Sequence, residues 1–120
     1  MKLFSGLIVV AVRNLEAASA WYQEKFDLRY EKVKPDVDES PSILLVSREG
    51  EPRISLMTKD DDDAGEIDRP IMDTASAAKA REWLPARGVE VGPVQTDRQG
   101  THFVEMRDLE NNMIEICEEP

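Results

Sequence analysis

Hydrophobic and polar residues follow the same order twice along this chain. In the first half, a continuous aliphatic run precedes apolar residues at helical spacing, and alternating segments separated by polar turns come next. Asn14 stands just before the helical segment, where its side chain is a good N-cap. The pattern predicts a strand at residues 7–12, a helix at 15–26, and strands at 28–33, 42–47 and 53–59.

The second half repeats this order. Ser76 is a candidate N-cap for another helix, and Gly88 is well placed to end it. The predicted elements are a strand at residues 69–74, a helix at 76–87, and strands at 89–94, 101–106 and 113–118. When Val12 is aligned with Asp73, the two halves superimpose in pattern, although their sequence identity is negligible.

The repeated order predicts an α+β fold built from two paired βαβββ modules. We place the first module at residues 1–58, a loop at 59–67 and the second module at 68–120. Neither module has enough apolar surface to close a core alone, so the two would pack side by side in a single domain. Such a pair would form one curved mixed sheet with its helices outside, and its concave inner face would be the natural pocket.

The composition limits which cellular compartment and which partners we expect for this protein. An apolar fraction of 41% is ordinary for a folded domain, and a net charge of -10 would repel nucleic acids and anionic membrane surfaces. No stretch approaches the length of a transmembrane helix, and Arg13 ends the N-terminal apolar run too early for an export signal. Cys117 is the single cysteine, which excludes an intrachain disulfide. We expect a cytoplasmic protein that binds neither nucleic acids nor membranes.

The last predicted strand contains the most informative residue, Glu115. A strand that buries Ile114 and Ile116 on one face must place Met113, Glu115 and Cys117 on the other. A carboxylate in this position lies either at a solvated edge or in a pocket. The same alternation predicts the pocket-lining residues of the other strands: Leu7, Val9, Ala11, Arg53, Ser55, Met57, Arg69, Ile71 and Asp73.

The register of the last two strands has two alternatives, and both are compatible with the sequence. If odd-numbered residues face odd-numbered ones, Phe103 and Glu105 join Glu115 on the pocket face. If the register slips by one residue, His102 lies opposite Cys117, and these two share a face with Glu115 as a conceivable soft-metal site. His102 is the single histidine, so no other imidazole is available as a base or ligand.

Three segments together resemble one known superfamily. They are VVAVRNLEAASAWYQEKFDLRY at residues 9–30, AREWLPARGVEVGPV at 80–94 and RDLENNMIEI at 107–116. In order and spacing, they are similar to the vicinal oxygen chelate superfamily, which includes glyoxalase I, bleomycin-resistance proteins and extradiol dioxygenases. Leu109 and Asn111 replace the Pro and Gly usual in the last motif, and Asn111 tolerates the left-handed turn that the motif requires.

The resemblance also implies where a metal would be held. Metal-dependent members bind a divalent ion with residues from four strands, and Glu115 matches the ligand on the last strand. The other three positions fall on Leu7, on Arg69 and at or near Ser55. Leu7 offers no lone pair and Arg69 offers only positive charge, whereas a catalytic ion usually needs about three protein ligands. We therefore expect no cofactor, and Arg69 would instead pair with Glu115 or with a ligand.

We predict a glyoxalase- or bleomycin-resistance-like protein that binds a small molecule, similar in role to the drug-sequestering members of the superfamily. The predicted ligand-binding residues are Arg53, Ser55, Met57, Arg69, Phe103, Glu105 and Met113. The alternative is a lyase, isomerase or dioxygenase-like enzyme in which Glu115 is the catalytic base, or in which Glu115 or His102 binds a divalent metal. Two further alternatives are an ion-pair network without a ligand and a partner subunit for assembly. The resemblance also implies a homodimer.

Overall fold

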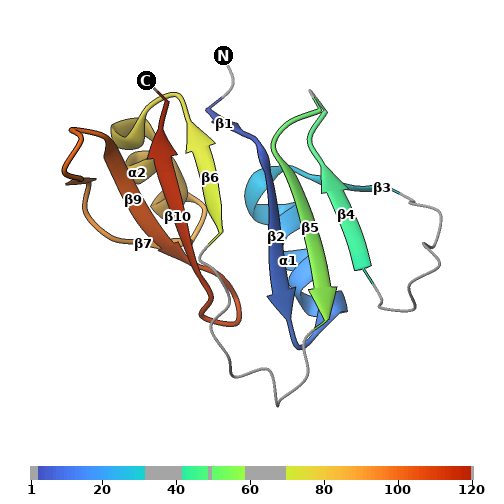
Figure 1. Ribbon diagram of the computed structural model, residues 1–120. Coiled ribbons are helices and arrows are strands. Elements are labelled where there is room, and N and C mark those ends of the chain that lie inside the picture. The colour runs from blue at the N-terminus through green and yellow to red at the C-terminus, as the bar shows by residue number, and fades with distance from the viewer. Residues whose placement is uncertain (1–2, 32–41, 49, 59–69, 120) are drawn as a thin grey trace. The chain divides into compact units, whose positions relative to one another are not determined.

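A computed structural model describes residues 3–31, 42–48, 50–58 and 70–119 of the chain (Figure 1). The chain forms two compact units, one of Leu7–Asp68 and the other of Met1–Gly6 with Arg69–Pro120. We call them the β2 unit and the β10 unit. The elements are β1 (Phe4–Ser5), β2 (Leu7–Val12), α1 (Leu15–Phe26), β3 (Arg29–Glu31), β4 (Ser42–Val46), β5 (Arg53–Thr58), β6 (Ile71–Thr74), α2 (Ala77–Ala86), β7 (Glu90–Val91), β8 (Gln95–Thr96), β9 (His102–Arg107) and β10 (Met113–Glu118).

The β2 unit is a four-stranded sheet with α1 against one face (Figure 1). The strand order is β2-β5-β4-β3, in which β2 and β5 are parallel and the other neighbours are antiparallel. Helix α1 follows Asn14, whose side chain accepts a hydrogen bond from the Ala17 N–H at 3.0 Å, and it ends at Asp27 with φ 53°. The core between helix and sheet consists mainly of Ile8, Val10, Val12, Tyr22, Leu45, Ile54 and Leu56.

The β10 unit is a six-stranded sheet with α2 against one face (Figure 1). Its strand order is β1-β6-β10-β9-β7, and β8 pairs with β9; only β6 and β10 run parallel. The Ser76 side chain caps α2 by accepting the Lys79 N–H at 3.2 Å, and Gly88 with φ 80° follows the helix. The core consists mainly of Phe4, Met72, Ala80, Leu84, Val104, Met106, Ile114 and Ile116.

The two units share one topology. In each unit, the strand that precedes the helix runs parallel to the last strand of the same unit. These parallel pairs are β2 with β5 and β6 with β10. This common arrangement confirms the predicted α+β fold of two βαβββ modules. The described strands form two mixed sheets, where the sequence predicted one. The predicted loop at 59–67 lies outside the described residues.

Two short strands fall outside the predicted series. Strand β1 pairs with β6, and its Phe4 ring packs edge-on against Trp83, with 5.2 Å between the ring centroids. Strand β8 pairs with β9 in a segment that the sequence predicts as a loop. A strand of two residues is too short to show alternation, so its tertiary contacts define it.

The remaining strand boundaries agree closely with the sequence, with one marked exception. Strand β7 is confined to Glu90–Val91, where a longer strand was predicted, and Pro93 has no N–H to continue the ladder. Among the described residues, neither helix has the length and apolar character needed to span a membrane.

Candidate functional site

Strand β10 lies between β6 and β9, so its side chains occupy the middle of both faces of the sheet. Ile114 and Ile116 are fully buried at 0% exposure, whereas Met113, Glu115 and Cys117 are partly exposed on the opposite face. This confirms the alternation predicted from the sequence. We call this second surface the β10 face. It comprises Ile71, Asp73, Gln95, Phe103, Glu105, Arg107, Met113, Glu115 and Cys117.

The pairing of β9 with β10 decides between the two predicted registers. Glu115 lies directly opposite Glu105, and Cys117 lies opposite Phe103. Odd-numbered residues therefore face odd-numbered ones, and the register that slips by one residue is wrong. His102 has the other parity and is exposed at the start of β9, so it does not share the β10 face with Glu115 and Cys117.

The turn between β9 and β10 explains how this register is held. Asp108 is only 8% exposed, and its Oδ1 accepts hydrogen bonds from the Glu110 N–H at 2.9 Å and the Asn112 N–H at 2.8 Å. Asn111 adopts φ 66°, the left-handed conformation that the sequence predicted for this position. The turn is thus fixed by side-chain hydrogen bonds to its own backbone, and it aligns the two strands.

Each carboxylate of the facing pair accepts a hydrogen bond from a neighbour on the same surface. The Gln95 side chain donates from Nε2 to Glu105 Oε1 at 2.8 Å, and the Cys117 thiol donates to Glu115 Oε2 at 3.4 Å. Sequence reasoning missed Gln95, because it lies on the two-residue strand β8 and no periodicity marks its face.

The Cys117 thiol is a hydrogen-bond donor here, not a nucleophile. Burial, the hydrogen bond to Glu115 and the charges of Glu115, Asp73 and Asp97 together raise the pKa of Cys117 to about 11, with burial the largest cause. At neutral pH the thiol is therefore protonated, whereas a nucleophilic cysteine must be a thiolate.

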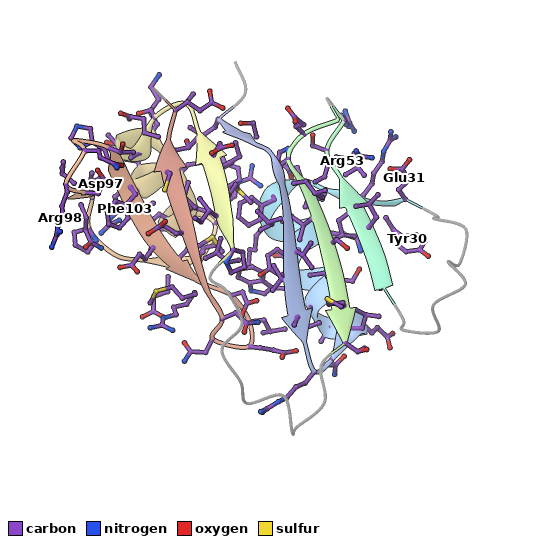
Figure 2. All side chains as sticks on the ribbon, in the orientation of Figure 1. Tyr30, Glu31, Arg53, Asp97, Arg98 and Phe103 are labelled. Atoms are coloured by element: carbon purple, nitrogen blue, oxygen red, sulfur yellow. The ribbon has the colours of Figure 1, made fainter. Side chains whose placement is uncertain are left out.

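The predicted ligand-binding residues divide between the two units. Phe103, Glu105 and Met113 share the β10 face with Glu115, and Phe103 is labelled in Figure 2. Arg69 lies outside the described residues.

Arg53, Ser55 and Met57 lie together on β5 in the β2 unit, on the face away from α1. Their neighbours in the sheet, Leu7 and Val9, are 58% and 50% exposed, so they form an exposed apolar patch beside the guanidinium of Arg53. The alternation of these residues confirms the predicted parity of β2 and β5.

The described residues do not fit the metal-ligand set of the metal-dependent superfamily members. Within the described ranges, no group of three or more His, Cys, Asp or Glu side chains is arranged to hold a metal ion. Leu7 carries no donor atom, and Ser55 offers only a hydroxyl. Glu115 does have a second carboxylate opposite it, but on a strand that the superfamily pattern does not assign.

The family comparison agrees with the fold. Residues 6–116 match the model of the Glyoxalase/Bleomycin resistance protein/Dioxygenase superfamily. The chain belongs to this superfamily. No curated protein sequence matches it significantly.

Solved structures share the superfamily fold at low sequence identity. A glyoxylase/bleomycin resistance protein/dioxygenase domain from Frankia sp. EAN1pec is 21% identical, with 96% of each chain covered and a TM-score of 0.68. A bleomycin resistance determinant encoded on the transposon Tn5 is 11% identical over 95% of this chain and 96% of its own, with a TM-score of 0.71. Lactoylglutathione lyase from Agrobacterium tumefaciens is 19% identical over 93% and 90%, with a TM-score of 0.63. At these identities the likeness shows the fold alone.

Proposed function

We propose that the protein binds a small organic molecule that carries a basic group, and that the β10 face contributes the binding surface. The observation that carries this proposal is the direct opposition of Glu105 and Glu115 across β9 and β10. Two carboxylates facing each other repel, and a cation placed between them relieves that repulsion. The net charge of -10 adds a long-range attraction for cations.

The neighbours of the two carboxylates suit the rest of such a ligand. Phe103 and Met113 lie on the same face, and Ile71 beside Glu115 is 54% exposed. An apolar or aromatic body can pack on these side chains, and the Phe103 ring also attracts a nearby cation. The sequence analysis placed two arginines, Arg53 and Arg69, among the predicted ligand-binding residues. On the described part of this face the guanidinium is Arg107, which donates to the Asn111 carbonyl at 3.2 Å.

Binding of simple probe ions tests the proposal. We expect benzylammonium to bind and to shift the backbone amide resonances of β9 and β10 in NMR titrations, whereas benzyl alcohol and benzoate bind at least about tenfold more weakly. Glu115→Gln removes one charge of the pair and weakens benzylammonium binding by about tenfold. Glu31→Gln is the matched control, because Glu31 is exposed on β3 in the other unit. Equal binding of all three probes would contradict the proposal.

We further propose that binding does not require a metal. The chemistry at the expected ligand positions supports this, since Leu7 has no donor atom and Arg69 is a cation. Calorimetric titration with Zn²⁺, Ni²⁺, Mn²⁺ and Fe²⁺ tests it. Stoichiometric, tight binding that Glu115→Ala abolishes would contradict the metal-free assignment.

A second candidate function is catalysis with Glu115 as a general base. It is favoured by the position of Glu115, which is partly exposed in the centre of the sheet and beside the apolar residues of the β10 face. The fold likeness to lactoylglutathione lyase is consistent with this chemistry. A panel of lyase, isomerase and dioxygenase substrates separates the two functions: turnover that Glu115→Gln abolishes supports catalysis, and turnover that survives this change excludes Glu115 as the base.

We also propose that the protein forms a homodimer, as the superfamily resemblance implies. The exposed apolar residues Leu7 and Val9 support an apolar interface, because their burial stabilises association. Sedimentation equilibrium of the wild type and of Val9→Glu tests this. A monomeric wild type contradicts it.

A further inference from the structure

We propose that Gln95 and Cys117 are positioning residues, which hold the facing carboxylates Glu105 and Glu115 in the orientation that receives the ligand's basic group. This inference rests on the proposed function of the β10 face. It assigns a role to two residues that the superfamily pattern does not use. One of them, Gln95, lies on a strand that the sequence did not predict.

Gln95 reaches Glu105 because β8 is held tightly against β9. Gln95 pairs with Phe103 and Thr96 pairs with His102, whose Nδ1 lies 2.9 Å from Thr96 Oγ1. In this register the Gln95 amide donates to Glu105 Oε1 at 2.8 Å. A side chain with several rotatable bonds loses rotamer freedom in such a bond, so Gln95 restricts the Glu105 carboxylate.

The turn after β8 keeps Gln95 in place. The Asp97 carboxylate accepts the N–H groups of Gln99 at 2.8 Å and Thr101 at 2.9 Å, and the Asp97 N–H donates to the Thr101 carbonyl at 3.0 Å. This turn, labelled at Asp97 and Arg98 in Figure 2, connects β8 to β9 and therefore fixes the strand that carries Gln95.

Cys117 restrains the other carboxylate from the same strand. Residues two apart on a strand point to the same face, which brings the Cys117 thiol to 3.4 Å from Glu115 Oε2. Because the thiol remains protonated at neutral pH, it donates to the carboxylate throughout the physiological range. Glu115 is thereby restrained from one side while its second oxygen, Oε1, receives no hydrogen bond from the described residues.

Side-chain rotamers in the ligand-free protein test the inference directly. Three-bond couplings measured by NMR report whether the Glu105 and Glu115 side chains occupy one χ1 rotamer or several. We expect single rotamers in the wild type, averaged couplings at Glu115 in Cys117→Ala, and averaged couplings at Glu105 in Gln95→Ala. Cys117→Ser restores a donor and should restore the single rotamer of Glu115. Gln99→Ala is the matched control, because the Gln99 side chain is exposed in the turn after β8, and the substitution keeps the backbone N–H that Asp97 accepts.

Benzylammonium affinity then connects orientation to binding. We expect Cys117→Ala and Gln95→Ala each to weaken it by about threefold to tenfold, Cys117→Ser to bind nearly as the wild type, and Gln99→Ala to leave it unchanged. Unchanged couplings in Cys117→Ala and Gln95→Ala overturn the positioning role, whether or not these variants bind benzylammonium. Averaged couplings with unchanged affinity overturn its importance for binding. If the wild type does not bind benzylammonium, the proposed ligand class fails, while the couplings still decide the positioning role.

Discussion

Replacement of Asp108 tests how the turn between β9 and β10 sets the candidate site. Three of the hydrogen bonds to the Asp108 carboxylate come from the turn itself, two at Oδ1 from the N–H groups of Glu110 and Asn112 and one at Oδ2 from the Asn112 side chain at 3.0 Å. At about 1 kcal/mol each, their loss in Asp108→Ala lowers the free energy of unfolding by about 3 kcal/mol. Asp108→Asn keeps an acceptor for both backbone donors and loses only the third bond, so it costs about 1 kcal/mol.

Urea denaturation followed by tryptophan fluorescence measures these differences. A Trp21→Phe background leaves Trp83 as the remaining tryptophan, and Trp83 lies in the same unit as Asp108. Glu90→Ala, an exposed carboxylate of that unit, is the control and should change the free energy of unfolding by less than about 0.5 kcal/mol. Equal losses for Asp108→Ala and Asp108→Asn, or a loss below about 1 kcal/mol for Asp108→Ala, would refute the role of the turn.

Three further predictions concern stability and pH. Gly6→Ala should lower the free energy of unfolding by about 1–2 kcal/mol in urea titrations, because φ is 94° and the new Cβ would lie 3.3 Å from Asp73 Oδ2. Glu118→Ala removes the carboxylate that accepts the Ala77 N–H at 2.9 Å, and should lower the melting temperature by about 4 °C; Glu118→Gln retains an acceptor and should lose less. The raised pKa of Cys117 stabilises the fold below pH 9.0, and this stabilisation disappears as the pH rises through about 11; Cys117→Ser should lack this pH dependence in urea titrations.

Local signals in the sequence determined most of the fold. The predicted helix at 15–26 and the predicted last strand at 113–118 have the same bounds as α1 and β10. Alternation identified the buried and exposed sides of β2, β5 and β10 because one side of each strand packs against a helix. The end of the first helix at Asp27 and the left-handed conformation of Asn111 were also predictable, since each depends on the chemistry of one residue.

The composition of the site depended on long-range pairing, which the sequence did not decide. Glu115 could be assigned to a face, but the residue opposite it followed from the register of β9 and from the turn at Asp108. Gln95 could not be assigned at all, because β8 exists only through its pairing with β9. The predicted partner Arg69 lies outside the described residues, so its pairing with Glu115 stays a prediction.

Under the proposed function, the register of β9 and β10 also contributes to the choice of ligand. A carboxylate opposite an arginine would be neutralised within the sheet, and a cationic ligand would then compete with that arginine. Glu115 is instead opposite Glu105, and like charges in directly opposed positions destabilise a sheet. Hydrogen bonds from Gln95 and Cys117 offset part of this cost without supplying positive charge. A bound cation would add positive charge beside the two carboxylates, and we expect this to raise the affinity of the β10 face for basic ligands over neutral ones.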